Sequence, residues 1–387
     1  MRVVLIFINI ALAAAFATPH CVAKLPIFRR AVCSLQGKNS VVMAQKRVVV
    51  WFRNDLRVHD NYVLAEAAKW MSSNRGMEVR SCGLVYNDKF MTLLCLERYS
   101  TIDPDDDMYD NVCSQVVPVY CFDPRHFATS QYGPKKCGVL RAKFLHESVD
   151  DLKTRLRSMG SDLLVYQGTP ESIMPTLMAS AGETTVLAQE EVTDEELRVE
   201  VAVRNAIKPL GGSLKLLWGA TLYHKDDLPF KSDLADMPDV FTPFKDACEK
   251  KCRSVRACVA TPASLPAVPA DLLDKAKSPL PPLTALGFEA HEASSAGKLD
   301  PRAVLPFKGG ETAALARLTH YFWDSDCLRV YFETRNGMLG ADYSSKFSAW
   351  LAHGCLSPRF IYAEQQRYEQ TREVLSFLAL LVKKYKY

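Results

Sequence analysis

Short apolar runs alternate with amphipathic stretches along residues 47–218. Runs rich in β-branched and aromatic residues predict buried strands at 47–52, 116–122, 162–166, 185–189 and 213–218. The longest helical pattern, over residues 139–159, carries one apolar stripe formed by Leu140, Phe144, Leu145, Val149, Leu152 and Leu156. Short apolar strands separated by helices predict an α/β fold built on a doubly wound, five-stranded parallel sheet.

Capping residues mark where three of the helices begin. Asp60 predicts the N-cap of a helix that runs to about residue 70. Thr169 followed by Pro170 offers a capping hydroxyl and a proline at the first helical position. The run 193–196, Thr-Asp-Glu-Glu, has the spacing of a capping box. We therefore expect helices to start at these places.

The pattern changes beyond the fifth strand. Residues 261–306 are rich in proline, alanine and serine and show little periodicity, which is typical of a linker. From Glu311 onward no strand pattern follows, and a buried helix is predicted by the spacing of Ala313, Leu315, Leu318 and Phe322. We predict a presequence at 1–45, an α/β domain at 46–256 with an insertion at 71–114, a Pro-rich linker at 257–306 and a helical domain at 307–387.

Composition narrows the class of protein. The 387 residues include 48 basic and 44 acidic ones, so the net charge of +4 does not indicate a polybasic DNA-binding protein, although it leaves room for a local basic groove. The 12 cysteines are spread too thinly for a secreted disulfide scaffold. Cys248, Cys252 and Cys258 lie close in sequence, but no second group with zinc-site spacing accompanies them. We expect ordinary reduced thiols and no metal site.

The N-terminal 45 residues have the pattern of a targeting sequence. Arg2 precedes a short apolar run at 3–15, whose last alanines offer a cleavage site. Residues 16–45 are basic and contain no acidic residue. The string 14–19 (AAFATP) resembles the cleavage motif of plastid presequences in algae with secondary plastids. We predict a plastid location and no membrane segment in the mature protein, with the mitochondrion or a simple secretory signal as alternatives.

The segment 71–114 is long for a connection between a helix and the next strand. It carries five aspartates between residues 103 and 110, which suggests a calcium loop. That interpretation does not fit, because Met108 takes the place of the turn glycine and Ser114 that of the terminal acid. We expect a solvated insertion or a translated intron.

Charged and amide residues cluster directly after the first strand. The string 51–57 (WFRNDLR) is followed by His59, Asp60 and Asn61. At the end of a strand such groups either orient a ligand or form a buried salt-bridge network that ties down loops. The sequence has no Gly-x-Gly-x-x-Gly after this strand and no P-loop lysine, which excludes the standard dinucleotide-binding and P-loop classes.

Several longer strings indicate a family. The string 51–57 resembles the photolyase and cryptochrome family, and residues 118–125 (PVYCFDPR), 218–224 (WGATLYH) and 227–230 (DLPF) look like its DASH branch. The block 334–359, which begins TRNGMLG and ends GCLSPR, is long and specific. The resemblance covers residues 46 to about 369. It implies an α/β antenna domain followed by an all-α FAD-binding domain, of which this chain holds only part.

The resemblance also implies a function. Family members are flavoproteins in which FAD absorbs blue light, and its reduced form passes an electron to a cyclobutane pyrimidine dimer in DNA. DASH members are similar to photolyases that prefer single-stranded DNA, whose bases cost less to extrude. The chain is thereby identified with a deoxyribodipyrimidine photolyase. A blue-light receptor without repair activity and a short isoform with an antenna or interaction role remain the alternatives.

The resemblance assigns a set of FAD-binding positions. The positions that match those binding the FAD diphosphate are Tyr331, Ser344, Ser345, Lys346, Phe347 and Ser348. Hydroxyls and backbone N–H groups at a helix start suit a phosphate, and Lys346 adds positive charge. Without the family, the same serines predict only a helix cap.

One carboxylate matches the antenna site of the family. Glu191, past the fourth strand, takes the place of the carboxylate that faces the folate antenna, 5,10-methenyltetrahydrofolate. A carboxylate accepts two hydrogen bonds from the N–H edge of a pterin. The alternative is an acid that faces solvent among Glu190, Glu195 and Glu196. In addition, Lys346, Arg359 and Arg367 are candidates for a DNA-facing surface.

The end of the chain departs from the family. Family members continue past residue 369 with a helical region that builds the isoalloxazine pocket and carries the electron-relay tryptophans. Here residues 374–385 are apolar and then basic, and the last tryptophan is Trp350. We therefore assign no catalytic residue. The chain as written is expected to be C-terminally truncated, to bind little or no FAD and to repair nothing.

Overall fold

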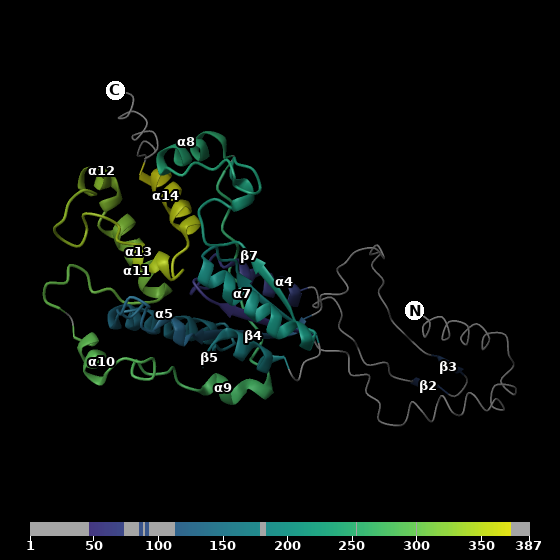
Figure 1. The fold of residues 1–387 in the computed structure, drawn as a ribbon. Helices are drawn as coiled ribbons and strands as arrows, with labels where there is room; N and C mark the ends of the chain where they lie inside the picture. Colours follow the sequence, from purple (N-terminus) through teal and green to yellow (C-terminus); the bar gives the residue numbers. More distant parts are fainter. Residues whose placement is uncertain are drawn as a thin grey trace. The chain divides into compact units, whose positions relative to one another are not determined.

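The computed structural model describes residues 46–72, 85–87, 90–92, 113–178, 183–252, 254–298 and 300–372 (Figure 1). The helices and strands that build the sheet region are β1 Lys46–Phe52, α4 Tyr62–Ser72, β4 Cys113–Phe122, α5 Val139–Ser158, β5 Leu164–Gln167, α6 Pro170–Ile173, β6 Thr184–Gln189, α7 Asp194–Ile207 and β7 Ser213–Leu217. Two short strands between α4 and β4, β2 Val85–Asn87 and β3 Phe90–Thr92, form a separate antiparallel pair. The helices that follow are α8 Phe241–Lys251, α9 Leu273–Lys277, α10 Ala290–Ala296, α11 Glu311–Thr319, α12 Tyr331–Thr334, α13 Ser348–Ala352 and α14 Pro358–Arg372. The predicted presequence and the aspartates of the insertion lie outside the described residues.

The main sheet confirms the predicted doubly wound architecture. Its five strands are parallel in the order β5-β4-β1-β6-β7. In the centre, Val48 of β1 is in register with Val116 of β4 and Thr185 of β6. The chain winds from β1 towards β5 on one side and from β6 to β7 on the other. The carboxyl ends of β1 and β6 therefore form the switch point where ligands bind in such folds.

Both faces of this sheet are covered. On β1, Val48, Val50 and Phe52 join one apolar core with residues of α4 and α5. Val49 and Trp51 join a second core with residues of α6 and α7. Because every other residue of a strand faces the same side, a continuous apolar run fills both cores at once. This explains why the strands lack alternating polarity.

The helix starts differ in detail from the predictions. Asn61, not Asp60, caps α4, because its Oδ1 accepts a hydrogen bond from Leu64 N at 3.0 Å. The Asp60 carboxylate instead accepts one from Val259 N at 2.9 Å, and its φ is +44°. Thr169 and Thr193 occupy the predicted N-cap positions without a side-chain bond to the helix backbone. These helices therefore begin without the capping bonds that their sequences suggest.

Packing explains two further differences in the helical stripes. Leu140 belongs to the predicted stripe of α5 but is 67% exposed, whereas its other members are buried. In α11 the buried position is Ala314 rather than Ala313, with Leu318 one turn further on. After α11 the chain forms a π-helical turn at His320–Asp324, which shifts the phase of the buried residues.

The predicted linker is packed against the sheet region. It contains α9 and α10, and it buries Leu265 and Phe288 in the core. The buried ammonium of Lys153 on α5 donates to the Ala276 carbonyl at 2.7 Å. At the start of β1, Arg47 pairs with Asp271 at 2.9 Å. The low hydrophobic periodicity of this proline-rich segment is therefore explained by its short helices, which are stabilised by contacts with the sheet region.

The helical region after residue 307 is joined tightly to the sheet region. Trp350 Nε1 donates to the Lys308 carbonyl at 2.9 Å, and the Trp350 ring packs on Phe144 of α5. A Cβ placed on Gly354, whose φ is +63°, would lie only 1.9 Å from the Asn54 carbonyl oxygen. Only glycine fits this close backbone approach. Within the described ranges, no helix is long and apolar enough to cross a membrane.

Candidate functional site

The carboxyl ends of β1 and β6 bring several charged side chains together. Arg53, which follows β1, pairs with Glu200 of α7 at 2.5 Å, and both side chains are nearly buried. Glu200 also accepts a hydrogen bond from Glu191 N at 3.2 Å. The backbone that carries Glu191 is therefore fixed at the switch point of the sheet.

The Glu191 carboxylate is held by amides from two strand ends. Its Oε1 accepts hydrogen bonds from Asn54 Nδ2 and Gln189 Nε2, each at 3.3 Å. Burial raises the pKa of Glu191 above its ordinary value, against the lowering effect of the nearby Arg53 charge. By contrast, Glu195 is exposed and pairs with Lys136 at 2.7 Å. Glu191 is thus a partly desolvated hydrogen-bond acceptor, which suits a ligand that carries N–H donors.

The charged string after β1 ties loops together. Arg57, which is buried, donates to the Gly354 carbonyl at 2.9 Å. Glu311, at the start of α11, accepts a hydrogen bond from Val58 N at 2.7 Å and lies 2.6 Å from His59 Nδ1. Of the two interpretations of this string, these contacts favour the buried network over a ligand site.

Arg359 belongs to the same network. It is 2% exposed and lies 2.9 Å from the Asp60 carboxylate, which also accepts a hydrogen bond from the Ser357 hydroxyl. The prediction that Arg359 faces DNA is therefore wrong, because its charge is used inside the protein. Arg367 of α14 is exposed, and it pairs with Glu364 and stacks over Trp323.

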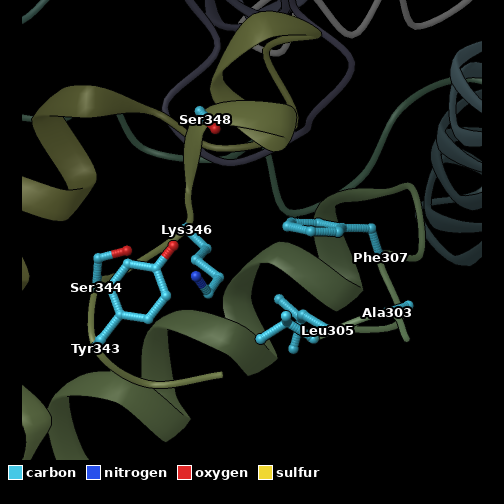
Figure 2. Close-up of a pocket in the computed structure, with 8 residues that line it drawn as sticks. Ala303, Leu305, Phe307, Tyr343, Ser344, Lys346 and Ser348 are labelled. Carbon is cyan, nitrogen blue, oxygen red and sulfur yellow. The ribbon is translucent and has the colours of Figure 1, made fainter. Parts of the chain in front are cut away.

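A second group of polar residues surrounds an open pocket of about 450 Å³ in the helical region. The pocket is lined by Ala303, Val304, Leu305, Phe307, Tyr343, Ser344, Lys346 and Ser348. Figure 2 shows Tyr343, Ser344 and Lys346 along one side and Leu305 and Phe307 along the other. Two hydroxyls, a phenol and an ammonium thus face an apolar wall.

Lys346 has an unusual conformation in this pocket. Its φ is +55°, a left-handed value that residues other than glycine adopt rarely. Its ammonium lies 3.4 Å from the centroid of the Tyr343 ring, within cation–π distance. The charge is therefore kept at the pocket wall, and backbone strain of this kind is concentrated at functional sites.

One arginine holds the loop that carries these residues. The Arg317 guanidinium of α11 donates to three backbone carbonyls, those of Ala341, Ser344 and Ser345, at 3.0 to 3.2 Å. It also pairs with Asp342 at 2.6 Å. Sequence reasoning missed this residue. The sequence does contain a signal for it, because Arg317 is a charged residue that lies between Ala314 and Leu318 on the buried side of the predicted helix.

The structure gathers some of the predicted FAD-binding residues and separates others. Ser344, Lys346 and Ser348 line the pocket together. Ser345 is tied to Arg317 through its carbonyl. Phe347 is buried, and its ring packs against those of Tyr321 and Phe322. Tyr331, the first residue of α12, packs against the core and is not part of the pocket lining.

The donors of the pocket fit a phosphate or diphosphate. Hydroxyl and ammonium groups are the usual side-chain partners of phosphate oxygens. The helix that begins at Ser348 has only five residues, so its dipole adds little. Apart from these donors and the Tyr343 phenol, the side chains of the lining are apolar. In the described part of the chain, no group of three or more His, Cys, Asp and Glu side chains is arranged to hold a metal ion.

Comparisons with known proteins agree with this geometry. A profile of the DNA photolyase family matches residues 110–269. Cryptochrome DASH from Gloeobacter violaceus is 42% identical over 85% of this chain and 55% of its own length. A relative from Arabidopsis thaliana, named cryptochrome DASH, chloroplastic/mitochondrial, is 41% identical over 88% of this chain and 50% of its own length. The chain thus spans about half the length of the curated relatives it matches.

Solved structures give the same result. The crystal structure of a Synechocystis cryptochrome superposes with a TM-score of 0.68 at 39% identity, over 88% of this chain and 59% of that one. A class III photolyase from Agrobacterium tumefaciens, at 21% identity and a TM-score of 0.56, shares the fold.

Proposed function

The chain belongs to the photolyase and cryptochrome family, and on that premise we propose that it carries the antenna domain and the diphosphate-binding loop of a DASH-type photolyase. The reaction proposed for a protein of the relatives' full length is the blue-light-driven repair of cyclobutane pyrimidine dimers, preferentially in single-stranded DNA. The observation that carries the proposal is the pocket in which Ser344, Lys346 and Ser348 meet.

The residues of this pocket would hold the diphosphate of FAD. Ser344 and Ser348 supply hydroxyl donors, Lys346 supplies the positive charge, and Arg317 keeps the loop in shape from behind. When bound, the flavin supplies the light absorption and the electron for repair. The protein's part at this pocket is to bind and orient. Ser345, Phe347 and Tyr331 would contribute backbone groups and packing.

A second proposed site lies at the switch point of the sheet. There Glu191 would accept hydrogen bonds from the pterin of a folate antenna such as 5,10-methenyltetrahydrofolate. Support comes from its place past β6, its partial burial and its raised pKa. The amides of Asn54 and Gln189 hold the carboxylate in place and occupy only one of its oxygens.

The location is proposed from two observations. Residues 1–45 have the composition of an organellar presequence. Relatives from Arabidopsis thaliana and Ostreococcus tauri carry the words chloroplastic/mitochondrial in their names. We propose a plastid location, with the mitochondrion as the alternative.

Binding of three related ligands tests the diphosphate site. Equilibrium dialysis of the purified chain would compare FAD and ADP, which carry a diphosphate, with riboflavin, which does not. Because the chain spans only about half the length of its relatives, we expect weak binding at one site for which FAD and ADP compete, with riboflavin at least tenfold weaker still. Ser348→Ala and Lys346→Ala should each weaken FAD binding by about 1 to 2 kcal/mol, because each removes a phosphate partner. Ser295→Ala in α10 is the matched control, since Ser295 lies outside the lining of the pocket.

The outcomes separate the alternatives. Equal binding of riboflavin and FAD, or an unchanged affinity in both variants, would contradict the diphosphate site. Light-dependent repair of a pyrimidine dimer in a single-stranded oligonucleotide then tests the reaction. Bound flavin without repair would favour the blue-light receptor over the enzyme.

A further inference from the structure

Two cysteines lie one helical turn apart at the end of α8. Cys252 N donates to the Cys248 carbonyl at 2.9 Å, so Cys252 sits directly after the last turn. Residues four apart in a helix have Cα atoms about 6 Å from one another. That spacing falls within the range found across disulfide bonds. The backbone thus holds the two Cα atoms at a separation that a disulfide can span.

The two thiols are also close to each other. Burial raises the pKa of the Cys248 thiol to about 11, and the neighbouring Cys252 adds to the rise through charge repulsion and a hydrogen bond. Tyr223 lies near both thiols, together with Tyr362 of α14. Cys258, the third cysteine of the sequence cluster, instead lies near Asp60 and Arg359.

The pair is asymmetric in exposure. Cys248 is buried and Cys252 is half-buried, so an oxidant reaches Cys252 first. Lys250 and Lys251, both exposed, occupy the last turn of α8 beside it. Positive charge near an accessible thiol attracts anionic disulfides such as oxidised glutathione. One thiol is therefore placed to attack and the other to resolve.

We propose that Cys248 and Cys252 form a reversible thiol–disulfide site that reacts with low-molecular-weight disulfides. The Cys252 thiolate attacks one sulfur of oxidised glutathione, forms a mixed disulfide and releases one glutathione thiolate, which takes up a proton. The Cys248 thiol then loses its proton, attacks the Cys252 sulfur and releases the second glutathione. Overall, two protein thiols are oxidised to one disulfide, and one glutathione disulfide is reduced to two thiols.

The bond requires a local movement at the end of α8. Side chains four apart in a regular helix have Cβ atoms about 5 to 6 Å apart, whereas a disulfide needs about 3.8 Å. Cys252 is already outside the helix, with φ −67° and ψ +136°. The disulfide therefore requires the two Cβ atoms to approach by about 1 to 2 Å, at the end of the helix rather than inside it. In addition, the mixed disulfide removes the Cys252 charge that raises the pKa of Cys248.

The test is a redox titration of the full chain. The purified protein is equilibrated in glutathione buffers of increasing oxidation, quenched with acid, alkylated and digested for mass spectrometry. We expect the peptide that spans both cysteines to lose the mass of two hydrogens and to escape alkylation, and a dithiol reductant to reverse both changes. Cys327, which is half-buried and has no neighbouring cysteine in the described region, is the internal control that forms only a mixed disulfide.

Two variants sharpen the result. In Cys248→Ser the resolving thiol is missing, so a glutathione adduct should accumulate at Cys252. In Cys252→Ser the buried Cys248 should react at least tenfold more slowly than Cys252 does. The proposal is overturned if both thiols can still be alkylated after equilibration under oxidising conditions. It is also overturned if either cysteine forms its disulfide with another cysteine of the chain.

Discussion

The two candidate sites are built in different ways. Glu191 stands at the end of a strand, and amides from two strand ends fix its carboxylate. The loop from Ala341 to Ser348 has no strand beneath it, and its carbonyls at Ala341, Ser344 and Ser345 depend on Arg317. A group at the end of a paired strand should tolerate the loss of one contact better than a loop in which three carbonyl hydrogen bonds come from one arginine. The difference predicts unequal sensitivity to single substitutions.

The largest effect is expected where one residue holds the loop. Arg317→Ala leaves three carbonyls without their donor, and Asp342 keeps only its longer contact with His320, at 3.3 Å. We expect a loss of about 3 kcal/mol in the free energy of unfolding, measured by urea denaturation, and loss of FAD binding. Arg329→Ala is the matched control, because Arg329 is exposed and its ion pair spans 3.8 Å. Equal losses in the two variants would contradict the proposed role of Arg317.

The buried carboxylate of Glu311 joins the helical region to the sheet region, and the stability of the protein should therefore depend on pH in the acid range. Burial alone would raise the pKa of Glu311, but hydrogen bonds from His59 and Val58 N outweigh it, so the pKa lies below the usual 4.5. The stabilisation is therefore complete above about pH 4.5 and is lost as the pH falls through the folded-state pKa. Glu311→Gln should lower the free energy of unfolding at pH 7 by about 2 kcal/mol and weaken its dependence on pH below 4.5. Parallel acid profiles for the two proteins would show that another group is responsible.

The Glu191 carboxylate should matter for the binding of a ligand and little for the stability of the fold. Since burial raises the pKa of Glu191, the neutral isostere in Glu191→Gln costs no stability at pH 7, and thermal unfolding should move little. Binding of methenyltetrahydrofolate, followed by fluorescence, should weaken roughly tenfold. Glu190→Gln, which breaks only the pair with Lys225, should leave that affinity unchanged. The same weakening in both variants would argue against a specific contact at Glu191.

The smallest effects on the free energy of unfolding are expected from the N-cap residues of two helices in the α/β region. Thr193→Ala removes a side chain that makes no capping bond, so the free energy of unfolding should change by less than about 0.5 kcal/mol. Asn61→Ala removes a real cap together with the hydrogen bonds that Asn61 Nδ2 donates to Asp55 and Arg57, and should cost at least about 1 kcal/mol. Urea denaturation measures both. Reversed magnitudes would mean that the capping contacts differ from those described above.

The sequence was a good guide to the sheet and a poorer guide to contacts between distant residues. The strands were predictable because apolar runs such as 48–50 are sufficient to specify burial on both faces. The roles of Asp60 and Arg359 were not, because the two residues meet across about 300 positions of sequence. Arg317 was missed for the same reason, since its partners lie on a loop that no periodicity describes. Local pattern specifies elements, whereas buried charges are placed by the fold.

The glycine at position 354 also bears on the spacing of the two sites. Asn54 donates to Glu191 through its side chain, while its backbone is in contact with Gly354, a few residues beyond Ser348. Backbone that touches backbone leaves no room for a hinge. If the two sites hold an antenna and a flavin, as proposed, this contact acts as a rigid spacer between them. Transfer of excitation energy falls steeply with distance, so a fixed gap would give every absorbed photon the same chance of reaching the flavin.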